Sequence, residues 1–333
     1  MPRLSQFPAI IGFVALSLPA HGLDCSTKAA KDGTVVSAIC ADPQLLQADK
    51  EMNDAYSNLY KGRDKKQQRV VRNMQKDWLW SRKNCDKAGR QCLMSMIHAR
   101  TEFLLSADGI GPSSQGKLVF KGVYVDAGDG WGGTDISLYE FEKPDTDGKK
   151  SFNEAVDKIY AENGGGEQSV AKSVSVDTGN TYDCSHCSIT KMMNPPFQVK
   201  NFISAPVSEQ SDNGFKIYDS TIYINQFLDK RATLAYRDLL QEYDVSLLAK
   251  SCYDQVMAGL EDKTSLPAAT TGDKASRRPS NEFMGYFRDP ANWKFDSKSI
   301  TFTLPFTDFD QECTISYETL RQHLAEDAVL PAK

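Results

Sequence analysis

Eight cysteines, arranged in two groups of four, constrain the fold of this chain more than any other feature of its sequence. One group lies before residue 93 and the other after residue 183, with no cysteine between them. An even number of cysteines in an oxidising compartment favours disulfides over metal ligation or free thiols. The spacing therefore predicts two separately stapled domains, whose candidate disulfide residues are Cys25, Cys40, Cys85, Cys92, Cys184, Cys187, Cys252 and Cys313.

The first 22 residues have the pattern of a secretory signal peptide. Arg3 is followed by the apolar run Phe7–Leu18, and residues 20–22 offer small side chains on both sides of His21. Asp24, next to Cys25, does not suit a lipidation site. No later stretch approaches the roughly 20 apolar residues of a transmembrane helix. We expect export to the periplasm or the medium, with no membrane span after signal cleavage.

Composition narrows the class of partner. The chain has 333 residues, 40% of them hydrophobic and 25% charged, which is enough to form a core and excludes wholesale disorder. The formal net charge is −5, and it becomes −6 when Arg3 is removed with the signal peptide. A chain without an excess of basic residues is poorly suited to binding nucleic acid. A basic protein, in contrast, would be attracted to this chain.

The segment from residue 23 to residue 107 is predicted to be a small all-helical module. Asp42 is the predicted N-cap of a helix, and Pro43 is its first residue. Apolar residues then recur at helical spacing until Gly62. A second helix, with Val71, Met74, Trp78 and Cys85 at the same spacing, and a third through 92–104 follow after short turns. Antiparallel packing would bring the first four cysteines to one end, where three pairings are open.

A pattern of cysteines, aromatic residues and charged residues runs through this segment: Asp24-Cys25, Ile39-Cys40-Ala41-Asp42-Pro43, Leu45, Asp49, Tyr56, Gln75, Trp78-Leu79, Arg82, Cys85, Cys92-Leu93 and Arg100. With this pattern the segment resembles the N-terminal domain of the LprI-type lysozyme inhibitors over residues 23–106. The resemblance implies secretion and a partner that is lysozyme or another cell-wall hydrolase.

The matching residues are predicted to be structural. Trp78 has the spacing of a core residue, and Arg82 is expected to pair with Asp49 across the hairpin. Tyr56 and Arg100 belong to the same motif. Contacts with a partner are expected on loops instead.

Residues 108–333 are predicted to form a larger α+β domain. A Gly-, Pro- and Ser-rich seam at 107–116 precedes it, and an exposed loop at 262–281 interrupts it. Strands are expected at 117–125, 134–141, 169–176, 199–207, 215–227, 293–295, 299–305 and 313–317, a strand entering a helix at 232–243, and helices at 151–162, 245–260 and 318–324.

Two segments in the second half of this domain have a distinctive pattern: Asn225–Leu240, which contains Leu-Ala-Tyr-Arg-Asp-Leu-Leu, and Trp293–Leu324, which contains Thr-Ile-Ser-Tyr-Glu-Thr-Leu. With these segments the second half of the domain resembles the extracytoplasmic domain of the RsiV anti-sigma factors. Domains of that type are associated with lysozyme binding, so this resemblance implies the same partner class.

Two local motifs are candidate sites. Cys184 and Cys187 form a CxxC that could be a redox dithiol, a zinc site or a loop disulfide; we favour a disulfide, either with each other or with Cys252 and Cys313. The glycine-rich turn at 126–133 lacks the acid that closes a calcium loop, because its twelfth position is a serine. Trp131 at the tip of this turn is therefore predicted to be an exposed contact for a partner or a sugar.

The sequence predicts a binding protein rather than an enzyme. It contains no GxSxG, HExxH or GxxxxGK[ST] motif, and we expect no catalytic residue, metal or cofactor. The function that fits best is inhibition of lysozyme, or of a similar cell-wall hydrolase, by protein–protein occlusion of its cleft. The alternative is an envelope protein that binds or acts on peptidoglycan.

Overall fold

The computed structural model describes the chain from the helical segment to the C-terminus with several gaps. The signal peptide predicted at 1–22 lies outside it. The described residues are 23, 25–26, 35–85, 89–111, 114–126, 133–162, 188–212, 217–230, 233–263, 279–306, 309–326, 328 and 330–331.

The N-terminal helices begin and end where the sequence provides caps. Asp42 accepts hydrogen bonds from the backbone N–H of Gln44 (2.8 Å) and Leu45 (3.2 Å), and Pro43 is the first helical residue. Asp64 caps the next helix through the N–H of Gln67. The elements are α1 (Val35–Ala41), α2 (Pro43–Lys61), α3 (Lys65–Ser81), the 3-10 turn η2 (Arg82–Cys85) and α4 (Gly89–Ala107).

Three disulfides are formed among the described residues. Cys25 pairs with Cys40 before α2, Cys85 at the end of η2 pairs with Cys92 near the start of α4, and Cys252 pairs with Cys313 in the C-terminal part. The last pair means that neither Cys252 nor Cys313 is available to the CxxC, so that alternative was wrong. Cys184 and Cys187 themselves lie outside the described residues.

A six-stranded sheet follows the helices. Its order is β1-β2-β3-β5, with β4 on the same edge of β5 as β3 and with β6 on the other edge. All pairs are antiparallel except β2 with β3. The strands are β1 (Leu118–Asp126), β2 (Gly133–Phe141), β3 (Ser188–Met193), β4 (Phe197–Val199), β5 (Phe202–Asp212) and β6 (Ile217–Phe227).

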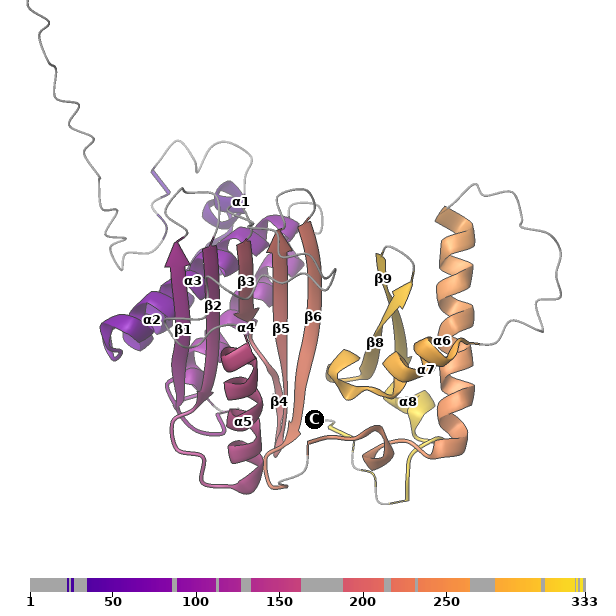
Figure 1. Ribbon diagram of the computed structural model, residues 1–333. Helices are drawn as coiled ribbons and strands as arrows, with labels where there is room; N and C mark the ends of the chain where they lie inside the picture. The colour runs from indigo at the N-terminus through magenta and orange to yellow at the C-terminus, as the bar shows by residue number, and fades with distance from the viewer. Residues whose placement is uncertain are drawn as a thin grey trace, which may run out of the picture.

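Helices cover both faces of this sheet (Figure 1). Alternate residues of β1 show the two faces. Gly122 faces α3, and a Cβ there would lie 2.5 Å from the Val70 side chain. Lys121 points to the opposite face, where its ammonium binds Asp157 of α5 (Asp147–Glu162). The missing side chain of Gly122 thus lets α3 approach the sheet closely.

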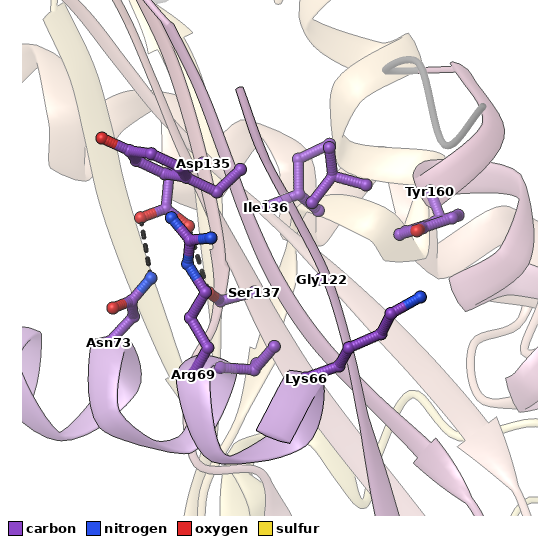
Figure 2. Close-up of a pocket in the computed structure, with 11 residues that line it drawn as sticks. Lys66, Arg69, Asn73, Gly122, Asp135, Ile136, Ser137 and Tyr160 are labelled. Carbon is purple, nitrogen blue, oxygen red and sulfur yellow. Dashed lines mark hydrogen bonds between the residues drawn. The ribbon is translucent and has the colours of Figure 1, made fainter. Parts of the chain in front are cut away.

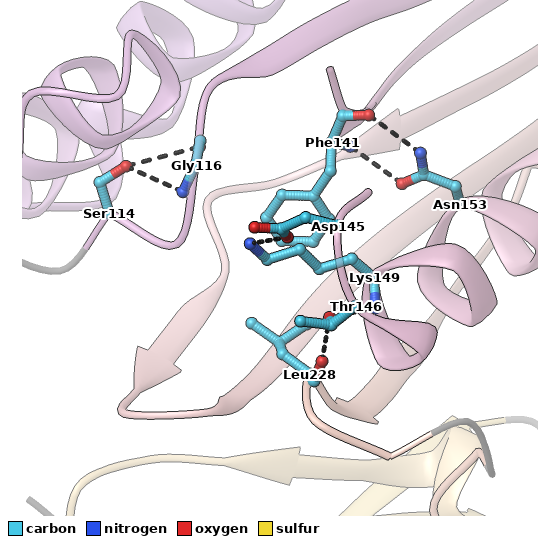
Figure 3. A network of polar contacts seen from close by, with 8 residues as sticks. All are labelled: Ser114, Gly116, Phe141, Asp145, Thr146, Lys149, Asn153 and Leu228. Atoms are coloured by element: carbon cyan, nitrogen blue, oxygen red, sulfur yellow. Dashed lines mark hydrogen bonds and ion pairs between the residues drawn. The ribbon is translucent and has the colours of Figure 1, made fainter. Parts of the chain in front are cut away.

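Helix α5 is attached to the ends of β2 and β6 by polar contacts (Figure 3). The amide of Asn153 bonds the backbone N–H and C=O of Phe141, each at 2.9 Å. The Thr146 hydroxyl donates to the carbonyl of Leu228, just after β6. Gly148 permits this approach, because a Cβ there would lie 2.1 Å from the Phe227 carbonyl oxygen.

The remaining elements form a second packing unit around a three-stranded antiparallel sheet. The Phe287 and Phe302 rings stack at 4.4 Å, and the Trp293 indole N–H donates to the Phe287 carbonyl. The elements are η3 (Tyr236–Asp238), α6 (Glu242–Lys263), α7 (Asn281–Arg288), η5 (Pro290–Asn292), β7 (Trp293–Phe295), β8 (Ser299–Phe306), β9 (Phe309–Ser316) and α8 (Tyr317–Leu320).

Side-chain packing divides the described residues near the end of β6 and not at residue 107. One core joins the N-terminal helices to the six-stranded sheet and α5, and the other joins α6, α7 and the three-stranded sheet to the lower ends of β5 and β6. At the junction, the Phe202 and Phe295 rings lie 4.8 Å apart, and Asn225 donates to the carbonyls of Pro290 and Trp293. The domain division at 107 stays a prediction about folding units.

The α+β class predicted from the sequence is confirmed. The predicted strands at 117–125, 134–141 and 293–295 correspond to β1, β2 and β7. The pattern analysis missed β3, β4 and the short helix α7, and the strand predicted at 169–176 lies outside the described residues. Within the part of the chain that the structure describes, no helix is long and apolar enough to cross a membrane.

Candidate functional site

The motif residues of the N-terminal helices form a buried frame. The Arg82 guanidinium binds the Asp49 carboxylate at 2.9 Å, and Asp49 is only 1% exposed. Arg82 also lies over the ring of buried Trp78, with its guanidinium carbon 5.0 Å from the ring centroid. Burial raises the pKa of Asp49 although Arg82 and Asn53 oppose it, and burial lowers the pKa of Arg82. These charges hold α2 and η2 together and are not open to a partner.

Arg100 is buried in the same core. Its Nε donates to the Gln75 side chain at 3.0 Å, and its guanidinium lies 5.2 Å from the centroid of the Phe103 ring. Burial lowers the pKa of Arg100 from 12.5 to about 10. Tyr56 is partly buried against the ring of Tyr60, and burial raises the pKa of Tyr56. Four of the five motif residues are thus buried and Tyr56 is partly buried.

An exposed aromatic lies directly outside this frame. Trp80 is 69% exposed, two residues after buried Trp78, and the Lys83 ammonium lies 3.5 Å from the centroid of the Trp80 ring. On the inner side of the same segment, Arg82 binds Asp49, and Cys85 is bridged to Cys92. We call Trp80 and Lys83 the Trp80 corner. It is a surface aromatic and a cation on a segment that the core holds in place.

A second candidate site is the hollow between α3 and the first two strands, which we call the α3–β1 groove (Figure 2). Its volume is about 460 Å³. Lys66, Arg69 and Asn73 face it from α3, because residues three, four and seven apart share one side of a helix. The register of β1 with β2 places Gly122 opposite Ser137 and Tyr124 opposite Asp135, so these four residues line the sheet side.

The polar groups of the groove are held in a fixed arrangement. Asp135 accepts a hydrogen bond from Asn73 on Oδ2 at 3.1 Å and one from Ser137 on Oδ1 at 3.3 Å. The Arg69 guanidinium stacks on Tyr124, 4.1 Å from its ring centroid. Neither Lys66 nor Arg69 forms an ion pair with any residue that the structure describes. The groove therefore presents two cations beside a carboxylate whose two oxygens both accept hydrogen bonds from the protein.

The C-terminal unit also has an exposed polar and aromatic surface. The Glu242 carboxylate accepts from the Tyr236 hydroxyl and binds Arg288 at 2.9 Å and Arg237 at 3.4 Å. These bonds keep the pKa of Glu242 below its usual value, the Tyr236 bond most of all. Tyr243, the next residue, is 80% exposed.

Residues 25–104 match the family model "Lysozyme inhibitor LprI". This match confirms the resemblance predicted for residues 23–106. No curated protein is similar enough to count as a match. Among solved structures, a DUF3298-family protein from Bacteroides fragilis is 15% identical; the match covers 64% of this chain and 95% of that one, with a TM-score of 0.38. A DUF3298-family protein from Pseudomonas aeruginosa is 12% identical, with 65% and 98% covered and a TM-score of 0.40.

The LprI-like segment, residues 25–104, contains the whole buried frame and the Trp80 corner. It supplies only one side of the α3–β1 groove, because β1 and β2 lie beyond its end. The groove is therefore a feature of the longer chain, in which the helices are packed on a sheet.

The structure does not test every site predicted from the sequence. Trp131, Cys184 and Cys187 lie outside the described residues. The described residues contain no group of three His, Cys, Asp or Glu side chains placed to hold a metal. The sequence analysis missed Trp80, although helical spacing gives a signal: residues two apart point to different sides of a helix, so a buried Trp78 leaves Trp80 outside.

Proposed function

We propose that this protein is an exported, non-enzymatic inhibitor of lysozyme or of a similar cell-wall hydrolase. The observation that carries the proposal is the match of residues 25–104 to the LprI family, whose motif residues build the buried frame described above. The resemblance of the second half of residues 108–333 to RsiV-type domains, still a prediction, points to the same partner class.

Export and charge support this proposal. Three disulfides fit an oxidising compartment outside the cytoplasm. The formal net charge of −5 would steer the protein toward a basic hydrolase, and that attraction weakens as salt screens it. Periplasm and medium are both compatible with this reasoning.

We propose occlusion of the substrate cleft as the mechanism, with the Trp80 corner as part of the contact. A glycosidase flanks the bond that it cleaves with two carboxyl groups, so its cleft attracts a cation. Trp is among the residues that most often anchor protein interfaces. Trp80 provides such a ring, and the Lys83 ammonium over it provides the cation, on a segment fixed by Arg82 and the Cys85–Cys92 disulfide. Trp131 stays a second predicted contact.

The decisive experiment is lysozyme activity on a cell-wall suspension with and without the purified, oxidised protein. We expect dose-dependent inhibition that is stronger at low salt than at high salt. Absence of inhibition at a large molar excess in low salt would overturn the proposal. Sedimentation of the protein with insoluble peptidoglycan, in the absence of lysozyme, would favour the alternative envelope function.

The contact surface is tested by removing the exposed aromatic. Trp80→Ala should weaken binding to lysozyme by about 30-fold or more, the equivalent of a loss of about 2 kcal/mol at an interface anchor. Tyr243→Ala, which removes an exposed aromatic from the C-terminal unit, is the matched control and should leave affinity unchanged. Trp131→Ala is measured in parallel. Unaltered affinity of the Trp80 variant would exclude this corner as the anchor.

A further inference from the structure

The α3–β1 groove is not needed for the proposed inhibition, and its chemistry fits another ligand. We propose that this groove binds a carboxylate-bearing sugar. Two sources share that chemistry: a muropeptide of peptidoglycan and an oligosaccharide of uronic acids. The proposal needs no lysozyme, so it stands or fails independently of the inhibitor function.

The charge of the groove selects an anion. Lys66 and Arg69 lie one helical turn apart on the same side of α3, and no described residue forms an ion pair with either. The only carboxylate lining the groove within the described residues, Asp135, has both oxygens engaged by Asn73 and Ser137. A ligand carboxylate would therefore meet two cations that the protein itself leaves available. Arg offers such a group two parallel N–H donors.

The orientation of Arg69 is set before a ligand arrives. Its guanidinium stacks on the Tyr124 ring with its carbon 4.1 Å from the centroid. Stacking on a ring restrains the planar guanidinium and leaves its edge N–H groups free to donate. Pre-organisation of this kind lowers the entropy lost on binding.

The rest of the groove fits a sugar better than a simple anion. The Asn73 amide and the Ser137 hydroxyl lie beside Asp135, and each has hydrogen-bonding capacity beyond the one bond that it makes there. Tyr124 is 48% exposed, and its ring forms part of the sheet side of the hollow. Aromatic rings pack against the apolar C–H face of a pyranose. Concave sites that combine aromatic walls with a few placed polar groups are typical of small-molecule binding.

The hollow depends on one glycine. Gly122 has no side chain, and a Cβ at that position would meet both Val70 and the Ile136 carbonyl oxygen at 2.5 Å. The close approach of α3 to β1 at this point sets the depth of the hollow, with Lys66 and Arg69 at its rim. A volume of about 460 Å³ is within the range of small-ligand pockets.

The test is calorimetric titration of the full, oxidised protein with four probes: a soluble muropeptide, a tri-uronic acid, neutral chitotriose and sodium sulfate. We expect one of the two acidic sugars to bind at least tenfold more tightly than chitotriose and sulfate, and the better of the two identifies the source. Equal binding of chitotriose would overturn the role of the carboxylate. Equal binding of sulfate would also overturn the proposal, because the groove would then bind anions in general. Binding of neither acidic sugar would overturn it altogether.

Matched variants locate the site. Arg69→Ala should weaken binding of the acidic sugar by at least tenfold, and Tyr124→Ala should weaken it as well. Arg72→Ala removes the same charge from an exposed position of the same helix, outside the groove. This variant should weaken binding of the acidic sugar only slightly, through the small change in the overall charge of the protein. Equal losses in the Arg69 and Arg72 variants would overturn the proposal. Unchanged circular dichroism in all three separates loss of binding from loss of fold.

Discussion

The two hydrophobic cores of this protein are stabilised in different ways. The core that joins the N-terminal helices to the six-stranded sheet buries the charged side chains of Asp49, Arg63, Arg82 and Arg100. Among the described residues, the core of the C-terminal unit contains no buried charged side chain. It consists largely of aromatic rings, with Trp293 packed on Phe302 at 5.3 Å.

The difference shows how each core specifies its packing. Buried charges contribute little net stability, because desolvation offsets their attraction, but they penalise any arrangement that leaves them unpaired. Aromatic packing stabilises mainly through the apolar area that it buries, and ring pairs add a preference for offset-stacked or edge-to-face geometry. The LprI-like segment thus specifies one helical arrangement by charge, whereas the C-terminal unit depends on apolar volume and a disulfide. Three predictions test this comparison.

The largest effect is expected when one member of the buried ion pair is removed. Arg82→Met leaves the Asp49 carboxylate buried without its partner and should lower the free energy of unfolding by about 3–5 kcal/mol. The double variant Asp49→Leu with Arg82→Met should recover most of that loss, because neither charge remains. Urea denaturation followed by circular dichroism measures both.

Arg237→Met, at an exposed ion pair, is the control and should leave stability nearly unchanged, because water and salt screen such a pair. A double variant as unstable as the single one would show that the pair contributes attraction and not only specificity. The two cores would then differ in the types of residue that they contain, and not in how those residues specify the packing.

Disulfide removal should affect the C-terminal unit more than the helical segment. Cys252 and Cys313 are 61 residues apart, and Cys85 and Cys92 are 7 apart. Loss of loop-closure entropy in the unfolded chain corresponds to about 4 kcal/mol for the first bridge and about 2 kcal/mol for the second. The two double Cys→Ala variants are compared by thermal unfolding under oxidising conditions. A larger effect at Cys85–Cys92 would indicate that contacts in the folded state, and not the loop, dominate.

The helices of the LprI-like segment were predictable because their signals are local. Asp42, Pro43 and Gly62 mark the ends of α2, and periodic apolar residues mark its buried side. The pairing of Arg82 with Asp49 followed from the antiparallel hairpin and the resemblance. The extent of the first core was not predictable, because its contacts with the sheet join residues far apart in the chain, as Val70 with Gly122.

The candidate sites were predicted less well than the fold. The α3–β1 groove combines Arg69 with Tyr124, and their contact depends on tertiary packing that no local pattern encodes. Strand β3 was missed because Ser188–Met193 follows a CxxC and precedes a proline pair, which resembles a loop. Trp80 could have been found from its position relative to Trp78, as helical spacing separates the two.

The smallest predicted effect is a difference in pH dependence between Asp49 in the first core and Asp296, a partly buried residue in the turn between β7 and β8. Burial raises the pKa of Asp49 above 3.8, so its contribution to stability is present below that pH and is lost as pH rises through the folded-state pKa. Burial also acts to raise the pKa of Asp296, but hydrogen bonds from the Ser299 hydroxyl and from the N–H groups of Lys298 and Ser299 lower it overall. The contribution of Asp296 is therefore present above pH 3.8 and is lost as pH falls through its folded-state pKa.

Asp49→Asn and Asp296→Asn measure these opposite slopes. The stability of the wild type relative to the Asp49 variant should decrease as pH rises between about 3 and 6, whereas its stability relative to the Asp296 variant should increase. Each change should stay below about 2 kcal/mol, since burial offsets part of what hydrogen bonds to a charged group contribute. Urea denaturation at several pH values gives both slopes. Slopes of the same sign would mean that the attraction of Arg82 for Asp49 exceeds the cost of desolvating Asp49. The ionised Asp49 would then stabilise the first core, as the ionised Asp296 stabilises the turn between β7 and β8.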